Sequence, residues 1–404
     1  MASGGSSVGG RSDAGFTETG LAALDATVAT HVDDQRVPGL VALVAQGGNG
    51  GKGGQVHVAA QGSLSIGGPP VTRGSLFRIA STTKPITAAA TLALVAEGRL
   101  GLDEPVDRLL PELADRRVLR RMDGPLDDTV PANRAITTRD LLTYTFGFGQ
   151  AFEMFTSPTP WPVTVRGDEL MLHTFGPPGP DVTPDPDTWI AALGSLPLVT
   201  QPGQRWLYNT SGSVLGVLLA RATGQPFGEV LRTRIFAPLG LRDTGFFTGH
   251  TERLTTAYRP TPDGLVVYDA PDGAWSRPPR FEDGSGGLVS TADDLLAFAR
   301  MLLAGGASVL PADLVRAMCT DQLTAEQKAN SSGYEAYLQG RSWGFGQAVA
   351  PTGAFGWDGG LGTSWLVDPR HDLTVIVLTQ RMWDSPGLPA VHQEIQAAAY
   401  VALT

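Results

Sequence analysis

Strand-like segments near both ends of the chain, separated by a long and mostly helical middle, limit the folds open to this sequence. Residues 39–46 and 55–60 are strand-like near the N-terminus, and residues 364–367 and 373–380 flank a turn near the C-terminus. Such distant segments share one sheet only when both ends of the chain meet in space. We therefore expect an α+β fold with an antiparallel sheet built from both termini, flanking helices and an inserted, mostly helical region.

The same pattern predicts how the chain is divided. Residues 1–15 are rich in Gly and Ser and are predicted to be a disordered leader. Residues 16–404 are expected to form one domain, in which residues 16–80 and 335–404 make a sheet lobe and residues 81–334 a mostly helical lobe. A cleft where the two lobes meet is the expected place for a functional site.

Apolar residues at helical spacing, together with end signals, predict the main helices. Ser290 with Asp293 resembles a capping box ahead of one of them. The expected helices are the one carrying Leu21, Leu24, Val28 and Val32, the one from Ser81 to Gly98, the one with Leu215, Leu218, Leu219 and Ala222 that Gly224 closes, residues 295–303 and residues 388–403.

One long segment of the middle is rich in Pro, Gly and Asp. It lies between Phe146 and Trp189, and a loop of that length is usually functional or disordered. Its aromatic residues Phe152, Phe155 and Trp161 could line a pocket.

Charge and cysteine content bear on partners and compartment. The formal net charge of −10 argues against nucleic acid or an anionic membrane as the main partner. No run approaches the ~20 apolar residues that a membrane span needs. Cys319 is the single cysteine, so an intramolecular disulfide is excluded, and we expect a cytoplasmic location.

The central motif of the sequence is Ser81-Thr82-Thr83-Lys84, at the expected start of a helix. Residues three apart on a helix share one face, so the Ser81 hydroxyl and the Lys84 amine can touch. A serine hydroxyl becomes a good nucleophile when a neighbouring base takes its proton. Lysine occurs at only two other positions, and unlike arginine it can lose its proton when desolvated. Lys84 is therefore a candidate base for Ser81.

Two further segments could complete such a site. Tyr208 stands directly before the helix that carries Leu215, and a tyrosine beside a lysine can relay a proton to a leaving group. We expect the positive charge of the lysine to lower the pKa of the Tyr208 phenol. The glycines of Trp357-Asp358-Gly359-Gly360 let a backbone N–H approach a ligand and join the N–H of Ser81 as an oxyanion hole.

These motifs and their order resemble the serine β-lactamase-related family, which holds class C β-lactamases, D-amino-acid peptidases and family VIII carboxylesterases. The resemblance covers nearly the whole chain after the leader. It rests on residues 77–87, 94–103, 141–145, 202–208, 238–245 and 286–291, and on the Val37-Pro-Gly39 stretch. It implies the β-lactamase/transpeptidase-like fold and acyl transfer through a serine.

The family pattern places the nucleophile on Ser81, the base on Lys84 and the tyrosine on Tyr208. It places the third motif on Trp357-Asp358-Gly359 and the second oxyanion donor on the N–H of Gly360. No metal or organic cofactor is implied, and the implied partner is a small-molecule ester. The oligomeric state is left unknown.

The sequence departs from class C β-lactamases at two positions. Trp357 stands where those enzymes have a lysine that can meet the substrate carboxylate, and it resembles the Trp-x-Gly variant of some family VIII esterases. Thr210 stands where they have an asparagine that holds the acylamino group. Both changes remove lactam-recognition groups, so we expect an esterase on short-chain or aryl esters. Asp358 would further repel an anionic substrate if its side chain faced the cleft.

Several alternatives stay open at this point. Gly340-Arg-Ser342-Trp-Gly344 fits the nucleophile elbow of α/β-hydrolases, with His371 or His392 downstream, although that elbow requires a strand before it and a helix after it. The protein could also be a β-lactamase, a D-amino-acid peptidase-like amide hydrolase, or a ligand-binding homologue without activity. The histidines His31 and His57 show no metal-ligand spacing.

Overall fold

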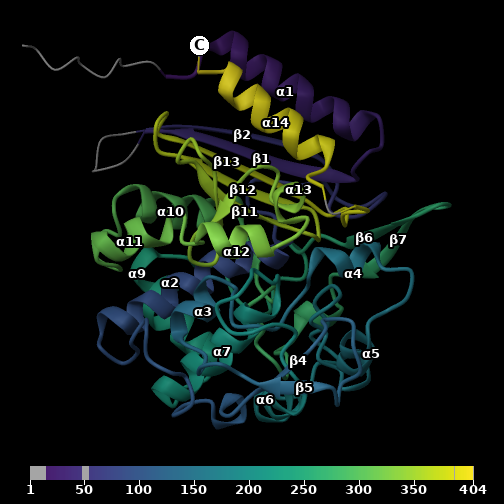
Figure 1. Cartoon of the computed structure of the whole chain (residues 1–404). Coiled ribbons are helices and arrows are strands. Elements are labelled where there is room, and N and C mark those ends of the chain that lie inside the picture. The colour runs from purple at the N-terminus through teal and green to yellow at the C-terminus, as the bar shows by residue number, and fades with distance from the viewer. Residues whose placement is uncertain (1–14, 48–53, 386, 404) are drawn as a thin grey trace, which may run out of the picture.

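The computed structural model describes residues 15–47, 54–385 and 387–403. A sheet crosses the molecule, with two helices above it and a larger, mostly helical region below it (Figure 1). The leader predicted at residues 1–15 and the loop predicted at residues 47–54 fall largely outside the described residues, and the boundaries of the two lobes stay a prediction.

In the part of the chain that the structure describes, the main sheet has seven antiparallel strands in the order β2-β1-β13-β12-β11-β10-β9. Both ends of the chain contribute to it, which confirms the predicted α+β, β-lactamase/transpeptidase-like architecture. The strands are β1 (Gly39–Gln46), β2 (Gln55–Gly62), β9 (Ser342–Trp343), β10 (Ala348–Val349), β11 (Phe355–Gly359), β12 (Thr363–Asp368) and β13 (Leu373–Thr379).

The two terminal helices cover the upper face of this sheet. Helix α1 (Glu18–Asp33) and helix α14 (Ala390–Val401) lie side by side there (Figure 1). Leu24 of α1 and Ile395 of α14 pack with sheet residues such as Val375 in one buried cluster. Every residue of β13 is buried, because helices cover both faces of the sheet at this strand.

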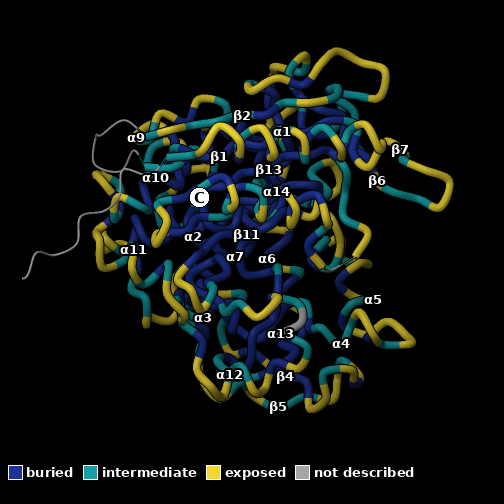
Figure 2. The backbone as a smooth tube through the Cα atoms, turned by 90° about the horizontal axis from the view of Figure 1, so that it is seen from above, coloured by how far each residue is buried: buried dark blue, intermediate teal, exposed yellow. Residues whose placement is uncertain are grey.

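The lower face of the sheet packs on the helical region. Within this region, helix α2 packs against helix α7. Helix α2 is apolar around nearly its whole surface and is buried from Thr83 to Leu94, so it forms the centre of the larger core (Figure 2, dark blue). The remaining helices are α2 (Thr83–Ala96), α3 (Thr138–Leu142), α4 (Phe152–Thr156), α5 (Pro162–Glu169), α6 (Pro186–Ser195), α7 (Thr210–Thr223), α8 (Phe227–Leu231), α9 (Ala237–Leu239), α10 (Ala292–Leu303), α11 (Ala312–Met318), α12 (Ala325–Asn330) and α13 (Tyr334–Tyr337).

In residues 15–47, 54–385 and 387–403, three short antiparallel pairs lie outside the main sheet. They are β3 (Phe77–Arg78) with β8 (Val289–Ser290), β4 (Arg117–Leu119) with β5 (Thr129–Pro131), and β6 (Ala257–Thr261) with β7 (Gly264–Asp269). The β6–β7 hairpin projects from the body of the molecule (Figures 1 and 2). The β3–β8 pair lies directly before α2 and therefore fixes the start of that helix.

Two details differ from the sequence predictions. The cap of α10 is Thr291, whose side chain accepts a hydrogen bond from the N–H of Asp294; the expected cap, Ser290, instead ends a strand. The long Pro-rich segment contains α4, α5 and the start of α6. Pro162 and Pro186 sit at the first positions of α5 and α6, where proline is tolerated.

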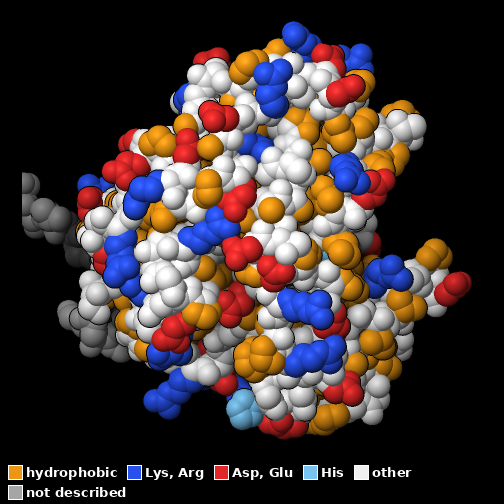
Figure 3. Space-filling view, turned by 90° about the horizontal axis from the view of Figure 1, so that it is seen from below, with side chains coloured by type: hydrophobic (Ala, Val, Ile, Leu, Met, Phe, Trp, Pro, Cys, Tyr) orange, Lys and Arg blue, Asp and Glu red, His pale blue; other side chains and the backbone are white. Residues whose placement is uncertain are grey.

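The described residues contain no helix that is long and apolar enough to cross a membrane. On the lower face of the molecule, acidic and basic side chains are interspersed (Figure 3).

Candidate active site

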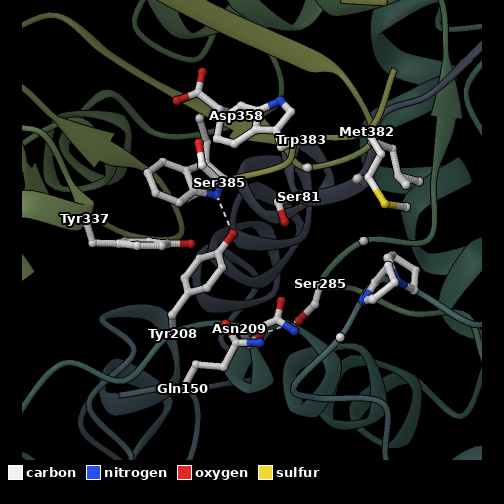
Figure 4. A pocket seen from close by; sticks show the side chains of 18 of the residues that line it. Ser81, Gln150, Tyr208, Asn209, Ser285, Tyr337, Asp358, Met382, Trp383 and Ser385 are labelled. Atoms are coloured by element: carbon white, nitrogen blue, oxygen red, sulfur yellow. Dashed lines mark hydrogen bonds between the residues drawn. The ribbon is translucent and has the colours of Figure 1, made fainter. Parts of the chain in front are cut away.

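A cavity of about 410 Å³ opens where the main sheet meets the helical region. It brings together four of the residues that the sequence singled out, Ser81, Tyr208, Trp357 and Gly360, from three separate segments of the chain; Figure 4 labels Ser81 and Tyr208. Its walls also include Gln150, Asn209, Asp283, Ser285, Tyr337, Arg341, Asp358 and Trp383.

Ser81 lies in a single 3₁₀ turn, Ala80–Thr82, that leads into α2. The residue before it, Ala80, has a φ of +44°, which is unusual for a residue with a side chain and is typical of functional sites that the surrounding structure holds in place. The restraint comes from β12, where the Thr363 hydroxyl donates to the carbonyl of Ile79 at 2.9 Å.

Gly359 allows the end of β11 to approach this turn. A Cβ atom at Gly359 would overlap the carbonyl oxygen of Ile79 and the hydroxyl of Thr363. Gly359 therefore packs behind the cavity wall and is not among the residues that line it. Its expected part in substrate binding stays a prediction, and the close approach explains why glycine is needed there.

The Lys84 side chain is fully enclosed and has three polar neighbours. Its Nζ lies 2.9 Å from the Oγ of Ser81, 2.8 Å from the Oδ1 of Asn209 and 2.7 Å from the carbonyl oxygen of Ser285. Burial lowers the pKa of the Lys84 ammonium to about 7, and the charge of Asp283 acts in the opposite direction. Near neutral pH a large fraction of Lys84 is thus an uncharged amine.

The three neighbours decide how that neutral amine is oriented. An uncharged amine has two N–H bonds and one lone pair. The carbonyl of Ser285 can only accept, and the amide oxygen of Asn209 faces Lys84 because its nitrogen donates to the carbonyl of Thr174 at 3.0 Å. Both N–H bonds are therefore committed, and the lone pair points at the hydroxyl of Ser81.

Asn209 reaches Lys84 through an unusual backbone turn. Its φ of 79° and ψ of −64° are those of a γ-turn, which the hydrogen bond from the N–H of Thr210 to the carbonyl of Tyr208 closes at 3.2 Å. Thr210 itself is fully buried in the first turn of α7 and lies outside the cavity lining. The predicted substrate-binding role of Thr210 stays a prediction, and the amide beside Lys84 comes from the residue before it, Asn209.

Tyr208 stands beside Lys84, whose Nζ lies 4.7 Å from the centre of the phenol ring. The expected lowering of its pKa is wrong. Burial dominates and raises the pKa of Tyr208 to about 12, although hydrogen bonds with Ser81, Trp357 and Tyr337 act to lower it. The phenol is therefore protonated at neutral pH.

Aromatic rings surround Tyr208 and hold it in place. The Nε1 of Trp357 donates to the phenol oxygen of Tyr208 at 2.8 Å (dashed in Figure 4). Trp357 is thus more than the apolar wall that the sequence indicates. Where the lactamase resemblance expects a charged lysine, the neutral indole N–H of Trp357 donates to Tyr208. The other rings within 7 Å of Tyr208 belong to Tyr144, Trp206, Tyr337 and Trp343.

Gly360 follows β11 and lines the cavity on the side of Ser81. Its carbonyl accepts a hydrogen bond from the N–H of Trp383 at 2.9 Å, which fixes the turn. This position is compatible with the oxyanion role predicted for the N–H of Gly360.

Arg341 is a cation of the cavity wall that the sequence motifs do not indicate. Its Nη2 lies 3.1 Å from the Oδ2 of Asp358, and its guanidinium stacks 5.4 Å from the centre of the Trp357 ring. The other oxygen of Asp358 accepts from the Ser364 hydroxyl at 2.7 Å. The negative charge expected at Asp358 is therefore compensated.

The competing nucleophile, Ser342, does not stand on an elbow. It lies within the short strand β9, and its hydroxyl is bound to Asp321 and Tyr334. The element after it among the described residues is the strand β10, not a helix; His371 is bound to Asp368, and His392 is buried. The described residues around Ser342 therefore do not form the strand–nucleophile–helix arrangement that the α/β-hydrolase interpretation requires.

The aromatic residues and the cysteine named from the sequence lie in different parts of the structure. Phe155 lines the cavity, whereas Phe152 lies in a side pocket and Trp161 in the core. Cys319 is half-buried, and burial raises the pKa of its thiol to about 12. Within residues 15–47, 54–385 and 387–403, no group of acidic, histidine or cysteine side chains could hold a metal ion.

Sequence reasoning missed Asn209, Ser285, Tyr337 and Arg341. Asn209 adjoins a motif, and a search for an amide near Lys84 could have found it. Ser285 acts through its backbone carbonyl, which no side-chain pattern reveals. Tyr337 and Arg341 come from the segment before β9, whose place beside the cavity depends on the tertiary fold.

Comparisons with known proteins show what this chain is similar to. A family model described as Beta-lactamase matches residues 24–399. Esterase EstB from Burkholderia gladioli is 33% identical over 398 residues, which cover 91% of this chain and 92% of that protein. Protein Rv1367c from Mycobacterium tuberculosis is 40% identical over 336 residues, 78% of this chain and 80% of its own.

Solved structures agree in fold as well. EstCE1, described as a hydrolase with promiscuous acyltransferase activity, superposes with a TM-score of 0.77 at 25% identity and covers 95% of this chain and 99% of its own. Unliganded simvastatin synthase from Aspergillus terreus superposes with a TM-score of 0.76 at 20% identity, covering 96% of this chain and 98% of its own, and shares the fold.

Proposed function

Because the chain belongs to the β-lactamase family and is a serine hydrolase, we propose that it hydrolyses carboxylic esters through an acyl-enzyme on Ser81, with short-chain or aryl esters as substrates. One observation carries the proposal: the Nζ of Lys84 lies 2.9 Å from the Oγ of Ser81 at the wall of a cavity of about 410 Å³. The esterase activity named for EstB supports the choice of ester.

Acylation begins with attack of the Ser81 oxygen on the ester carbonyl. The lone pair of neutral Lys84, aimed by Asn209 and Ser285, takes the hydroxyl proton. The N–H groups of Ser81 and Gly360 stabilise the oxyanion of the tetrahedral intermediate.

Collapse of this intermediate restores the carbonyl and breaks the bond to the alcohol. Tyr208, which is protonated at neutral pH, gives its proton to the departing oxygen. Lys84 passes the proton taken from Ser81 to the Tyr208 phenolate and is again a neutral amine. It then takes a proton from the water that attacks the acyl-enzyme, and it returns this proton to the Ser81 oxygen as the carboxylic acid leaves.

The charge of the cavity supports a neutral ester over an anionic β-lactam. Trp357 occupies the place where the lactamase resemblance expects a lysine, and its N–H is committed to Tyr208. Arg341 is already paired with Asp358. A missing charge-assisted hydrogen bond is worth roughly 1.5–3 kcal/mol, which is about one to two powers of ten in selectivity.

The test compares kcat/KM for p-nitrophenyl butyrate and for the chromogenic cephalosporin nitrocefin on one preparation, with Ser81→Ala as the background. We expect the butyrate value to exceed the nitrocefin value by at least tenfold. An equal or larger nitrocefin value would overturn the choice of ester and favour the lactam alternative. A cytoplasmic location stays a prediction.

A further inference from the structure

Tyr337 stands at the catalytic phenol although no motif of the chain points to it. It ends the short helix α13, lines the cavity, and its ring centre lies 5.2 Å from that of Tyr208. Its hydroxyl is directed toward the phenol oxygen of Tyr208 (Figure 4), and its interaction with that oxygen acts to lower the pKa of Tyr208.

The phenol oxygen of Tyr208 therefore has three polar neighbours. The indole N–H of Trp357 can only donate, so this contact uses acceptor capacity of the oxygen. Ser81 is the second neighbour and Tyr337 the third. When Tyr337 also donates, the phenol oxygen of Tyr208 accepts hydrogen bonds from both Trp357 and Tyr337. The phenol proton of Tyr208 then points toward Ser81, where the substrate reacts.

We propose that Tyr337 is a positioning residue which, together with Trp357, stabilises the negative charge that develops on Tyr208 as it protonates the leaving alcohol. This inference rests on the proposed esterase function. Hydrogen bonds to a charged oxygen are about twice as strong as those to a neutral one, so these two strengthen as the proton leaves. They therefore lower the barrier of the step itself, which is how a donor contributes to catalysis.

The step balances in atoms and charge. The C–O bond to the alcohol breaks while the oxyanion re-forms the carbonyl, and the alcohol oxygen receives the proton of Tyr208. The phenolate then faces the Lys84 ammonium, which holds the proton taken from Ser81. Transfer of that proton from Lys84 to Tyr208 restores both groups.

The burial of Tyr208 explains why hydrogen-bond donors at its oxygen matter. The aromatic enclosure makes the phenolate of Tyr208 costly, since burial raises the pKa of the phenol, and Trp357 and Tyr337, together with Ser81, offset part of this cost. Tyr337 is itself packed against the rings of Trp206 and Trp357, which fix its direction.

The test uses two esters of one acid, ethyl butyrate and p-nitrophenyl butyrate. The p-nitrophenolate ion leaves without needing a proton, whereas ethoxide requires one. We expect Tyr337→Phe to lower kcat/KM for ethyl butyrate by roughly 10- to 100-fold, as for loss of a hydrogen bond to a charge, and to change the p-nitrophenyl value by less than about threefold.

The matched control is Tyr334→Phe. Tyr334 begins the same helix, and its hydroxyl is bound to the Ser342 hydroxyl at 2.9 Å. This variant should keep the wild-type ratio between the two esters. Thermal melting of both variants checks the fold, and the ratio of the two kcat/KM values is independent of the fraction of protein that folds.

Equal losses on both esters in Tyr337→Phe, or the same change of ratio in Tyr334→Phe, would overturn the role of Tyr337. A Ser81→Ala variant that still hydrolysed p-nitrophenyl butyrate would instead overturn the proposed function. The two failures are therefore distinguishable.

Discussion

Replacing Asn209 by aspartate tests the account of Lys84 as the base. The change is nearly isosteric and places a carboxylate oxygen where the amide oxygen now lies, 2.8 Å from the Nζ of Lys84. Lys84 is fully enclosed and its pKa is about 7, so kcat/KM of the natural protein should fall about tenfold per pH unit below that value.

The size of the effect follows from Coulomb's law. At an effective dielectric constant of about 20, opposite unit charges at this distance attract by ~6 kcal/mol, or about four pH units. The cost of burying the new carboxylate offsets part of this attraction. We therefore expect the acidic limb of the pH profile to move upward by at least about two units, because the carboxylate favours the ammonium form.

The assay is the pH dependence of kcat/KM for p-nitrophenyl butyrate. At pH 7.5 the variant should be at least about 25-fold slower and should regain activity as the pH rises. Asn133→Asp is the matched control, since it adds the same charge at an exposed position and should leave the limb in place. An unmoved limb in Asn209→Asp would refute the assignment of the limb to Lys84.

Three other outcomes follow from the same contacts. Lys84→Arg keeps a charge but supplies no base, so kcat should fall by about 10²–10⁴ in the same ester assay; near-normal turnover would make Lys84 a structural residue. Asp283→Asn removes a charge that favours the ammonium, so the acidic limb should move to lower pH, and a shift upward would contradict the electrostatic argument. Gly359→Ala should lower the stability in urea unfolding by about 1–3 kcal/mol, because its Cβ meets the Ile79 carbonyl, whereas Gly360→Ala, with open space at its Cβ, should not.

Much of the fold was predictable because its signals are local. The strand runs of β1 and β13 and the stop of α7 at Gly224 depend on neighbouring residues, and the structure places them within a residue or so of the expected bounds. The cap of α10 was wrong by one position because Ser290 and Thr291 are chemically alike, and pairing of β8 with β3 decided between them.

The candidate site was predictable where one helix turn or one motif holds the residues together, as for Ser81 and Lys84. The direction of side chains and the surroundings that set their pKa values were not predictable. Trp357 was expected as a wall, but the aromatic packing turns its N–H toward Tyr208. The pKa of Tyr208 was expected to fall because a lysine is near; enclosure by rings from distant segments raises it. Such effects come from burial, which only the tertiary structure determines.

The most direct test of the central claim is the site of covalent labelling. The protein is treated with a serine-reactive phosphonate, its intact mass is measured, and the labelled peptide is sequenced by mass spectrometry. The account predicts one added phosphonyl group on Ser81, none on Ser81→Ala, and loss of esterase activity in proportion to labelling. A label on Ser342, with Ser81→Ala still labelled and active, would contradict it.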